Sequence, residues 1–162
     1  MTIPRLGITA AIEDTPLVRP QDFEAPFSWS DTAWFSRGPK PGDPGHALIF
    51  GHLDSYCCPA IFWHLNDLRS GDVVYVRYRT GKPLKFRVWW NHSYWESPTL
   101  VKWVVYHKTK DRALLLITCA GVFHGTEAGY DHREVVYATL DLPTHPAAKR
   151  SNSKSQSTKK KH

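Results

Sequence analysis

The chain has 162 residues, 41% of them hydrophobic, and its seven Trp, seven Tyr and seven Phe are enough to fill one sizeable core. This composition excludes a disordered or fibrous chain and indicates a single folded domain. The net charge of +6 favours no specific nucleic-acid partner, because six basic side chains in residues 149–162 supply all of it, and the other 15 Lys and Arg are balanced by 15 Asp and Glu.

Cysteine content and hydropathy further restrict the classes of protein to which the chain can belong. Cys57 and Cys58 are adjacent and would bridge only through a strained eight-membered ring, so the three cysteines predict no disulfide framework and leave Cys119 unpaired. There is no apolar run of about 18 residues and no signal-peptide pattern. We expect the chain as given to be soluble and any membrane anchor to lie outside it.

The amino-terminal third predicts two strands joined by a long loop. Residues 3–8, continuing to Ile12, form a first strand, and the proline-rich residues 16–44 form an extended loop. Four aromatic side chains should attach this loop to the core: Phe27, Trp29, Trp34 and Phe35. Residues 47–50 form a short apolar strand between two glycines, with His52 and Asp54 just beyond its carboxyl end.

The middle of the chain predicts helical turns and a hairpin. Residues 59–65 indicate one or two helical turns, with Ile61, Leu65 and Leu68 on one side. Residues 73–78 and 84–90 flank a Thr-Gly-Lys-Pro turn and predict a hairpin. In its second arm one buried face is expected to hold Leu84, Phe86, Val88 and Trp90. Residues 91–110 indicate a loop with a helical turn packed over the sheet.

The carboxyl-terminal part predicts the centre of the sheet. Residues 114–119 are apolar on both faces, as in a central strand, and residues 133–140 form the last strand. The fold class is therefore all-β, a closed or nearly closed β-barrel of about seven or eight strands with one or two short helices. We expect residues 1–142 to form this domain and residues 143–162 to be a disordered basic tail.

Three side chains at strand ends are candidates for catalysis. A thiol needs a nearby base or cation to act as a nucleophile, and His52 follows its strand as Cys119 follows its own. Neighbouring strands would present both at one edge, although a Gly-His pair at a strand end, read alone, more often marks a structural histidine. Arg133 shares a face with Val135 and Tyr137, whereas His132 and Glu134 point the other way. Alternatively, Arg133 pairs with Asp131 or Glu127 in solvent.

These residues resemble the motifs of one family. Leu116-Ile117-Thr118-Cys119 resembles the sortase Leu-x-Thr-Cys signature, Gly51-His52-Leu53-Asp54 resembles the segment with the sortase histidine, and Arg133 with Val135-Val136-Tyr137-Ala138 resembles the strand with its arginine. The order of these residues along the chain, His, Cys and Arg, also matches the family, and the similarity extends over residues 3–142. The resemblance is nearest to class E or class F sortases of Gram-positive bacteria. Leu115 departs from the Thr that often begins the cysteine motif.

The resemblance implies a cysteine transpeptidase that cuts an LPxTG-type sorting signal between Thr and Gly through a Cys119 thioester. His52 would be the general acid and base and Arg133 a hydrogen-bond donor to the oxyanion or substrate. Asp54 would orient His52 or cap its turn. The predicted substrate-binding residues are Thr118, Ala120, Gly121, Trp95, Leu100 and Trp103.

The resemblance also implies partners and location. These are a sorting-signal peptide and an amine acceptor, either a peptidoglycan precursor or a pilin lysine. It implies a monomer without cofactor or metal, on the extracellular face of the membrane.

Three other functions stay open on the sequence. Cys57, Cys58, His52 and His64 could form a metal site, although adjacent cysteines suit tetrahedral ligation poorly. A Cys-His hydrolase acting on cell-wall peptides would use the same thiol with water as acceptor. A β-barrel binding module would contact a polyanion through its tail.

Overall fold

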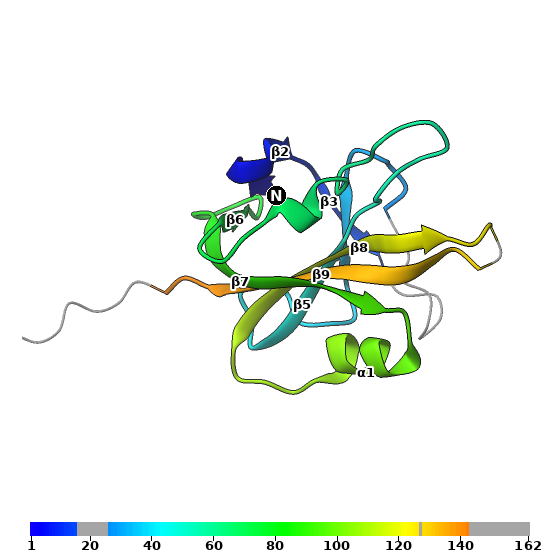
Figure 1. The fold of residues 1–162 in the computed structure, drawn as a ribbon. Coiled ribbons are helices and arrows are strands. Elements are labelled where there is room, and N and C mark those ends of the chain that lie inside the picture. Colours follow the sequence, from blue (N-terminus) through cyan, green and yellow to red (C-terminus); the bar gives the residue numbers. More distant parts are fainter. Residues whose placement is uncertain (16–25, 127, 143–162) are drawn as a thin grey trace, which may run out of the picture.

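The computed structural model describes residues 1–15, 26–126 and 128–142 (Figure 1). The predicted tail therefore lies outside the described residues, as does part of the predicted proline-rich loop. The strands are β1 (Thr2–Ile3), β2 (Ile8–Thr9), β3 (Ile12–Thr15), β4 (Thr32–Phe35), β5 (Gly45–Phe50), β6 (Val73–Val76), β7 (Leu84–Trp95), β8 (Arg112–Phe123) and β9 (Tyr130–Leu140). The helices are η1 (Pro4–Leu6) and η2 (Leu65–Asp67), both 3-10, and α1 (Pro98–Tyr106).

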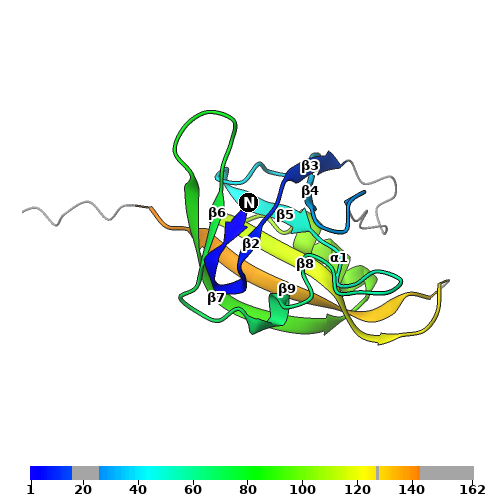
Figure 2. The same ribbon diagram turned by 90° about the horizontal axis from the view of Figure 1, so that it is seen from above.

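All nine strands belong to one sheet, in the order β2-β1-β6-β7-β9-β8-β5-β4-β3. The sheet is strongly curled, as the turned view in Figure 2 shows, so it forms a half-barrel. β8 pairs parallel to β5 and antiparallel to β9. This confirms the all-β prediction and the central place of residues 114–119, with more strands than expected.

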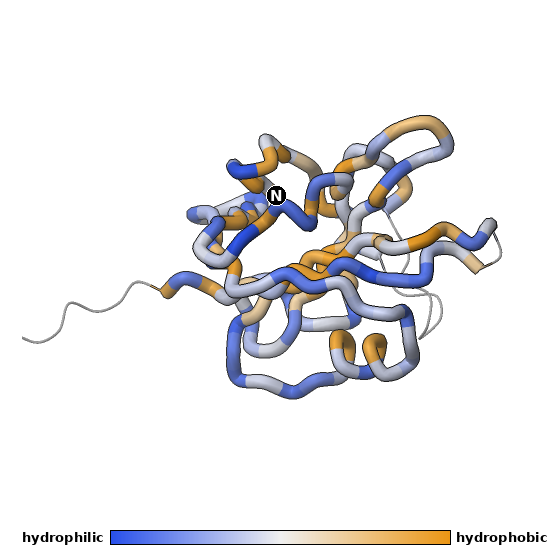
Figure 3. The backbone as a smooth tube through the Cα atoms, in the orientation of Figure 1, coloured by the Kyte–Doolittle hydropathy of each residue, from blue (hydrophilic) through white to orange (hydrophobic). Residues whose placement is uncertain are grey.

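Two apolar clusters cover the two faces of the central strands. On one face, Leu114 and Leu116 pack with Phe62 and Leu65 from the segment around η2. On the other, Leu115 and Ile117 pack beneath α1, and the middle of β8 is fully buried on both sides. Figure 3 shows apolar residues gathered where these strands cross. A strand buried on both faces holds the residues at its end in a fixed position.

The predicted hairpin is confirmed, with β6 antiparallel to β7. β7 continues further than expected, to Trp95, and a bulge between Val88 and Trp90 interrupts its pairing with β9. Phe86 and Val88 therefore face the η2 side, whereas Trp90 packs with the α1 cluster. The prediction that Trp90 shares their face is wrong, because the extra residue of a bulge reverses the alternation of side chains.

The amino-terminal predictions need two corrections. The first strand is not continuous, since Pro4 begins η1 between β1 and β2 and Gly7 ends it in the left-handed region with φ 65°. The predicted loop contains a strand, β4, in which Phe35 is buried and Trp34 packs against the core. Phe27, predicted to attach the loop, is 99% exposed.

The predicted helical turn within residues 91–110 is a full α-helix. Ser97 caps its amino end by accepting from Leu100 N, and Pro98 occupies the first turn, where its missing N–H costs nothing. α1 lies across the sheet from β2 and β6 (Figure 1). Its buried face consists of Leu100, Val101 and Val104. The helix thus closes the apolar face on which Cys119 lies.

Candidate active site

Parallel pairing of β5 and β8 brings the carboxyl end of β5 beside Cys119 in β8. Phe50 lies opposite Ile117, and Gly51 N donates to Ile117 O at 3.1 Å, so His52, just beyond the end of β5, lies at the level of Cys119. The prediction that the strand ends at Cys119 is wrong, because β8 continues to Phe123. A Cβ on Gly51 would come within 2.5 Å of the Phe62 ring, so glycine permits this close packing. The two predicted catalytic side chains therefore meet.

Arg133 joins them from β9. It lies directly opposite Cys119 in the β8–β9 ladder, and directly opposed residues share a face of the sheet. His52, Cys119 and Arg133 line one cavity of about 60 Å³, together with Phe50 and Ile117. The structure thus brings together all three residues that strand position and motif singled out.

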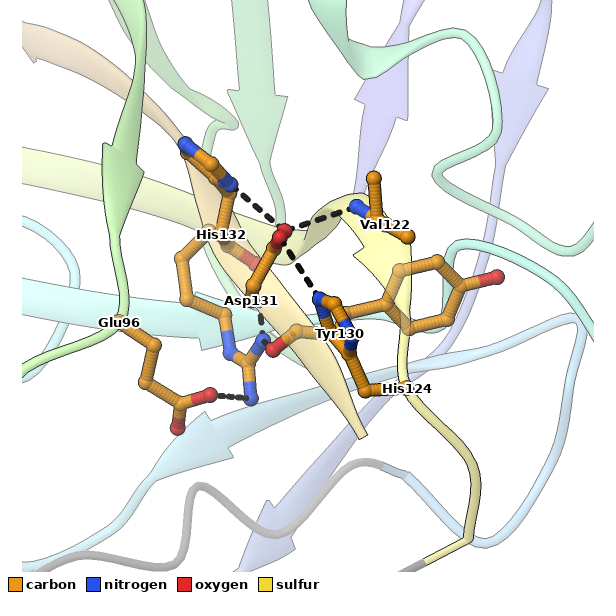
Figure 4. Close-up of polar contacts among 7 residues, drawn as sticks. Glu96, Val122, His124, Tyr130, Asp131 and His132 are labelled. Atoms are coloured by element: carbon orange, nitrogen blue, oxygen red, sulfur yellow. Dashed lines mark hydrogen bonds and ion pairs between the residues drawn. The ribbon is translucent and has the colours of Figure 1, made fainter. Parts of the chain in front are cut away.

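The guanidinium of Arg133 is held by three contacts and is only 15% exposed. Its Nη1 donates to Tyr130 O at 3.0 Å and to His132 O at 2.8 Å, and its Nη2 pairs with Glu96 Oε2 at 2.6 Å (Figure 4). Glu96 follows β7 and was not singled out from the sequence. Since a guanidinium has five N–H donors, these contacts fix its plane and leave donors for a substrate.

Burial and the neighbouring charges shift the pKa of Cys119 in different directions. Burial raises the pKa of the thiol, Arg133 lowers it, and the carboxylates of Glu96 and Asp54 raise it. A cation on the same face therefore offsets part of the desolvation of the thiolate. Cys119 is the free cysteine, whereas Cys57 and Cys58 form a disulfide between neighbours at the tip of the loop after His52.

His52 is positioned by two residues that sequence reasoning did not place near it. Its Nε2 lies 2.9 Å from Pro26 O, and its ring lies against Trp29, with centroids 4.1 Å apart. A carbonyl oxygen only accepts, so Nε2 carries a proton in this arrangement. Trp29 thus attaches its loop to the site and limits rotation of the imidazole.

Asp54 contacts a residue of β9. Tyr130 donates its hydroxyl to Asp54 Oδ2 at 2.5 Å, and this bond, followed by burial and the charges of Asp54 and Cys119, raises the pKa of Tyr130 to about 12. Asp54 also pairs with Pro59 in an isolated bridge that closes the loop after His52. The hydrogen bond fastens this loop to β9 beside Arg133.

A second, larger cleft reaches Cys119 from the opposite side of the sheet. Its volume is about 500 Å³. Its lining includes three predicted substrate-binding residues, Thr118, Ala120 and Gly121, together with Glu134 and residues around η2. Glu134 is only 8% exposed and lies opposite Thr118. Sequence reasoning placed Glu134 away from Arg133 but gave it no role.

The remaining predicted substrate-binding residues lie elsewhere. Trp95 is 68% exposed and packs against His132, on the face opposite Arg133. Leu100 is buried in the cluster beneath α1, and Trp103 packs against the same cluster. None of the three lines either cavity beside Cys119. Their role in binding stays a prediction.

Asp131 organises the turn between β8 and β9. It accepts from Val122 N at 2.7 Å and contacts the rings of His124 and His132 (Figure 4). The bonds to His132 and then His124 hold the pKa of Asp131 well below its usual range. Gly121 lies beneath this carboxylate with φ 81°. The irregular stretch of β8 that begins two residues after Cys119 is therefore tightly fixed.

Among the described residues, no three His, Cys, Asp or Glu side chains gather where they could hold a metal ion. The same part of the chain contains no helix of the length and apolar character needed to cross a membrane.

Comparison with known proteins identifies the family. The model of the sortase domain matches residues 1–141. No curated protein sequence matched the chain. Sortase C-1 from Actinomyces oris has 23% identity and a TM-score of 0.65 over 88% of this chain and 72% of its own. A lid mutant of sortase A from Corynebacterium diphtheriae has 20% identity and a TM-score of 0.64, over 90% and 69%.

A third similar structure widens the range of classes. A sortase D5 transpeptidase from Clostridium perfringens has 16% identity and a TM-score of 0.61 over 86% of this chain and 75% of its own. At these identities the structures show a shared fold. They belong to classes A, C and D, and assignment to class E or F stays a prediction.

Proposed function

The chain belongs to the sortase family of cysteine transpeptidases, and from this premise we propose that Cys119, His52 and Arg133 form its active site. The main support is their convergence on one cavity from β8, β9 and the end of β5. A nucleophile, an acid–base group and a cationic donor within one cavity are what acyl transfer requires.

Each side chain has a distinct role in the proposed reaction. The thiolate of Cys119 attacks the carbonyl carbon of the peptide and forms a thioester. His52 protonates the leaving amine, and its contact with Pro26 O helps to orient the ring for this step. Arg133 donates to the oxyanion or the substrate backbone, and its contacts to Tyr130, His132 and Glu96 prepare its orientation.

The proposed substrate is an LPxTG-type sorting signal, cut between Thr and Gly. The acyl group passes to an amine of a peptidoglycan precursor or a pilin. A thioester intermediate suits this order of reaction steps because it remains reactive towards amines. The corresponding location is the extracellular side of the membrane, where sorting signals and wall precursors meet.

Product analysis tests this function. An LPxTG-type peptide is incubated with the protein, with and without triglycine, and the products are separated by mass. Transpeptidation predicts a peptide joined to triglycine through its Thr, absent with Cys119→Ala. A product formed only with water, at any triglycine concentration, would instead indicate the hydrolase.

A further inference from the structure

The cleft of about 500 Å³ lies on the face of β8 and β9 that Arg133 does not occupy. Thr118 and Glu134 are directly opposed in the ladder, one residue from Cys119 and Arg133 respectively, so they point to the other side of the sheet. Thr118 and Cys119 each line both this cleft and the small cavity with His52. The two hollows therefore adjoin at these two residues of β8.

Two polar groups in this cleft are buried. Thr118 is 4% exposed, and its Oγ1 has no hydrogen-bond partner among the described residues. Glu134 is 8% exposed. A hydrogen bond from Ser93 and the nearby His92 stabilise the charged form of its carboxylate. A buried hydroxyl without a partner is unfavourable unless something else supplies one. The wall of the cleft next to the sulfur is thus prepared for a polar ligand.

The sign of charge in the cleft favours a cationic ligand. Arg133 is paired with Glu96 on the opposite face, so it does not neutralise Glu134. On the other wall Asp67 contributes a second carboxylate, paired with His64 at 3.1 Å. A carboxylate beside a thioester would repel an anionic group and attract an ammonium group.

We propose that this cleft, which we call the acceptor cleft (Thr118, Glu134 and the η2 wall at Asp67), binds the amine that receives the acyl group, with Glu134 recognising its ammonium. The proposal rests on the proposed function, since it assigns the second substrate of the same reaction. The acyl part of the sorting signal then lies on the Arg133 side of Cys119. The acceptor reaches the thioester from the other side.

An ammonium must lose one proton before its nitrogen can attack, and the Glu134 carboxylate accepts that proton. The nitrogen then attacks the thioester carbonyl carbon, the C–N bond forms, and the C–S bond breaks with its electron pair returning to Cys119. The second proton passes to His52, which restores the thiolate and the imidazolium. Glu134 returns its proton to water. Burial, which raises the pKa of Glu134, favours its acceptance of a proton.

The test separates the two half-reactions. Thioester formation on Cys119 is followed by mass spectrometry without acceptor, and transfer is then measured against triglycine concentration. Glu134→Gln removes the charge and keeps the shape, and the matched control is Asp14→Asn at an exposed position of β3. We expect Glu134→Gln to raise the triglycine KM on the order of tenfold and to affect thioester formation much less. The control should change neither.

Hydroxylamine, which is uncharged at neutral pH, gives a second readout. Glu134→Gln should impair transfer to triglycine far more than transfer to hydroxylamine, because only triglycine presents an ammonium. Thermal melting of each variant establishes that it is folded, and Thr118→Ser supplies a second variant that keeps the hydroxyl. An unchanged triglycine KM in folded Glu134→Gln would overturn the acceptor cleft while leaving the proposed function intact. Failure of the unsubstituted protein to form any thioester would overturn both.

Discussion

Cys119 and Arg133 are directly opposed in the β8–β9 ladder, so the proposed nucleophile and its neighbouring cation are fixed by the same backbone pairing. The side chains need no flexible loop to meet. The register of two long, buried strands determines their separation, and this register is enforced by the apolar residues on both faces.

Replacement of Arg133 tests whether the site needs a planar guanidinium as its hydrogen-bond donor. Arg133→Lys keeps the charge but cannot maintain the contacts to Tyr130 O, His132 O and Glu96 together, because an ammonium lacks the guanidinium fork. We expect kcat/KM for the sorting peptide to fall on the order of 100-fold. The surface variant Arg87→Lys, at a pair with Asp141, should retain activity. Equal activity of Arg133→Lys and the unsubstituted protein would refute the assigned role.

Replacement of Glu96 tests the electrostatics of the thiol. The Glu96 carboxylate raises the pKa of Cys119, so Glu96→Gln should lower it and extend thiolate formation to lower pH. The rate of alkylation by iodoacetamide is measured against pH, and Cys119→Ala supplies the background. An upward shift of the alkylation profile would contradict this account. Loosening of Arg133 should also reduce turnover, so reactivity and activity are expected to change in opposite directions.

The bond from Tyr130 to Asp54 predicts a pH dependence of stability. The pKa of Tyr130 is raised to about 12, against about 10 for an unfolded tyrosine, so folding favours the protonated phenol. Its contribution is complete below about pH 10 and is lost as the pH rises through about 12. In urea unfolding, the stability difference between the unsubstituted protein and Tyr130→Phe should shrink from about pH 8 to about pH 11. A constant difference would exclude this titration.

Gly121 and Gly125 form a matched pair for testing the irregular end of β8 after Cys119. Both have positive φ, but a Cβ on Gly121 would overlap Asp131 Oδ1 and His132 Nδ1, whereas Gly125 faces open space. Gly121→Ala should therefore lower the free energy of unfolding by at least about 1 kcal/mol more than Gly125→Ala. Urea denaturation measures both. Equal losses of stability in the two variants would mean that Asp131 and its hydrogen-bond partners adjust to the added Cβ at no cost in free energy.

The positions of His52, Cys119 and Arg133 could be predicted from sequence because each adjoins a strongly apolar strand. A continuous apolar run predicts a central strand, and the ends of neighbouring strands meet at one edge. The strand assignments for residues 47–50, 114–119 and 133–140 then bring the three side chains together.

The bulge in β7 could not be predicted, and it changes the face of the sheet on which Trp90 and Trp95 lie. Strict alternation would put Trp90 with Val88 and Trp95 on the face of Arg133. The extra residue at Trp89 reverses both, so Trp90 joins the α1 cluster and Trp95 packs on His132. No Gly or Pro in residues 84–95 marks this site in the sequence.

Glu96, Glu134 and Tyr130 were missed for a different reason. Each acts through a partner distant in the chain, and spacing along one strand does not reveal such partners. For Glu134 a signal did exist. The alternation that placed Arg133 on one face also placed a carboxylate between Val135 and Arg133 on the other, and a charge on a second buried face needs a partner or a ligand.

The proposed active site is tested most directly by the mass of the intact protein after brief reaction with an LPxTG-type peptide in the absence of amine. The thioester mechanism predicts an added acyl mass that maps to Cys119, is released by triglycine as a new amide, and is absent from Cys119→Ala. Turnover of the peptide with no adduct on Cys119, or an adduct on another residue, would contradict it.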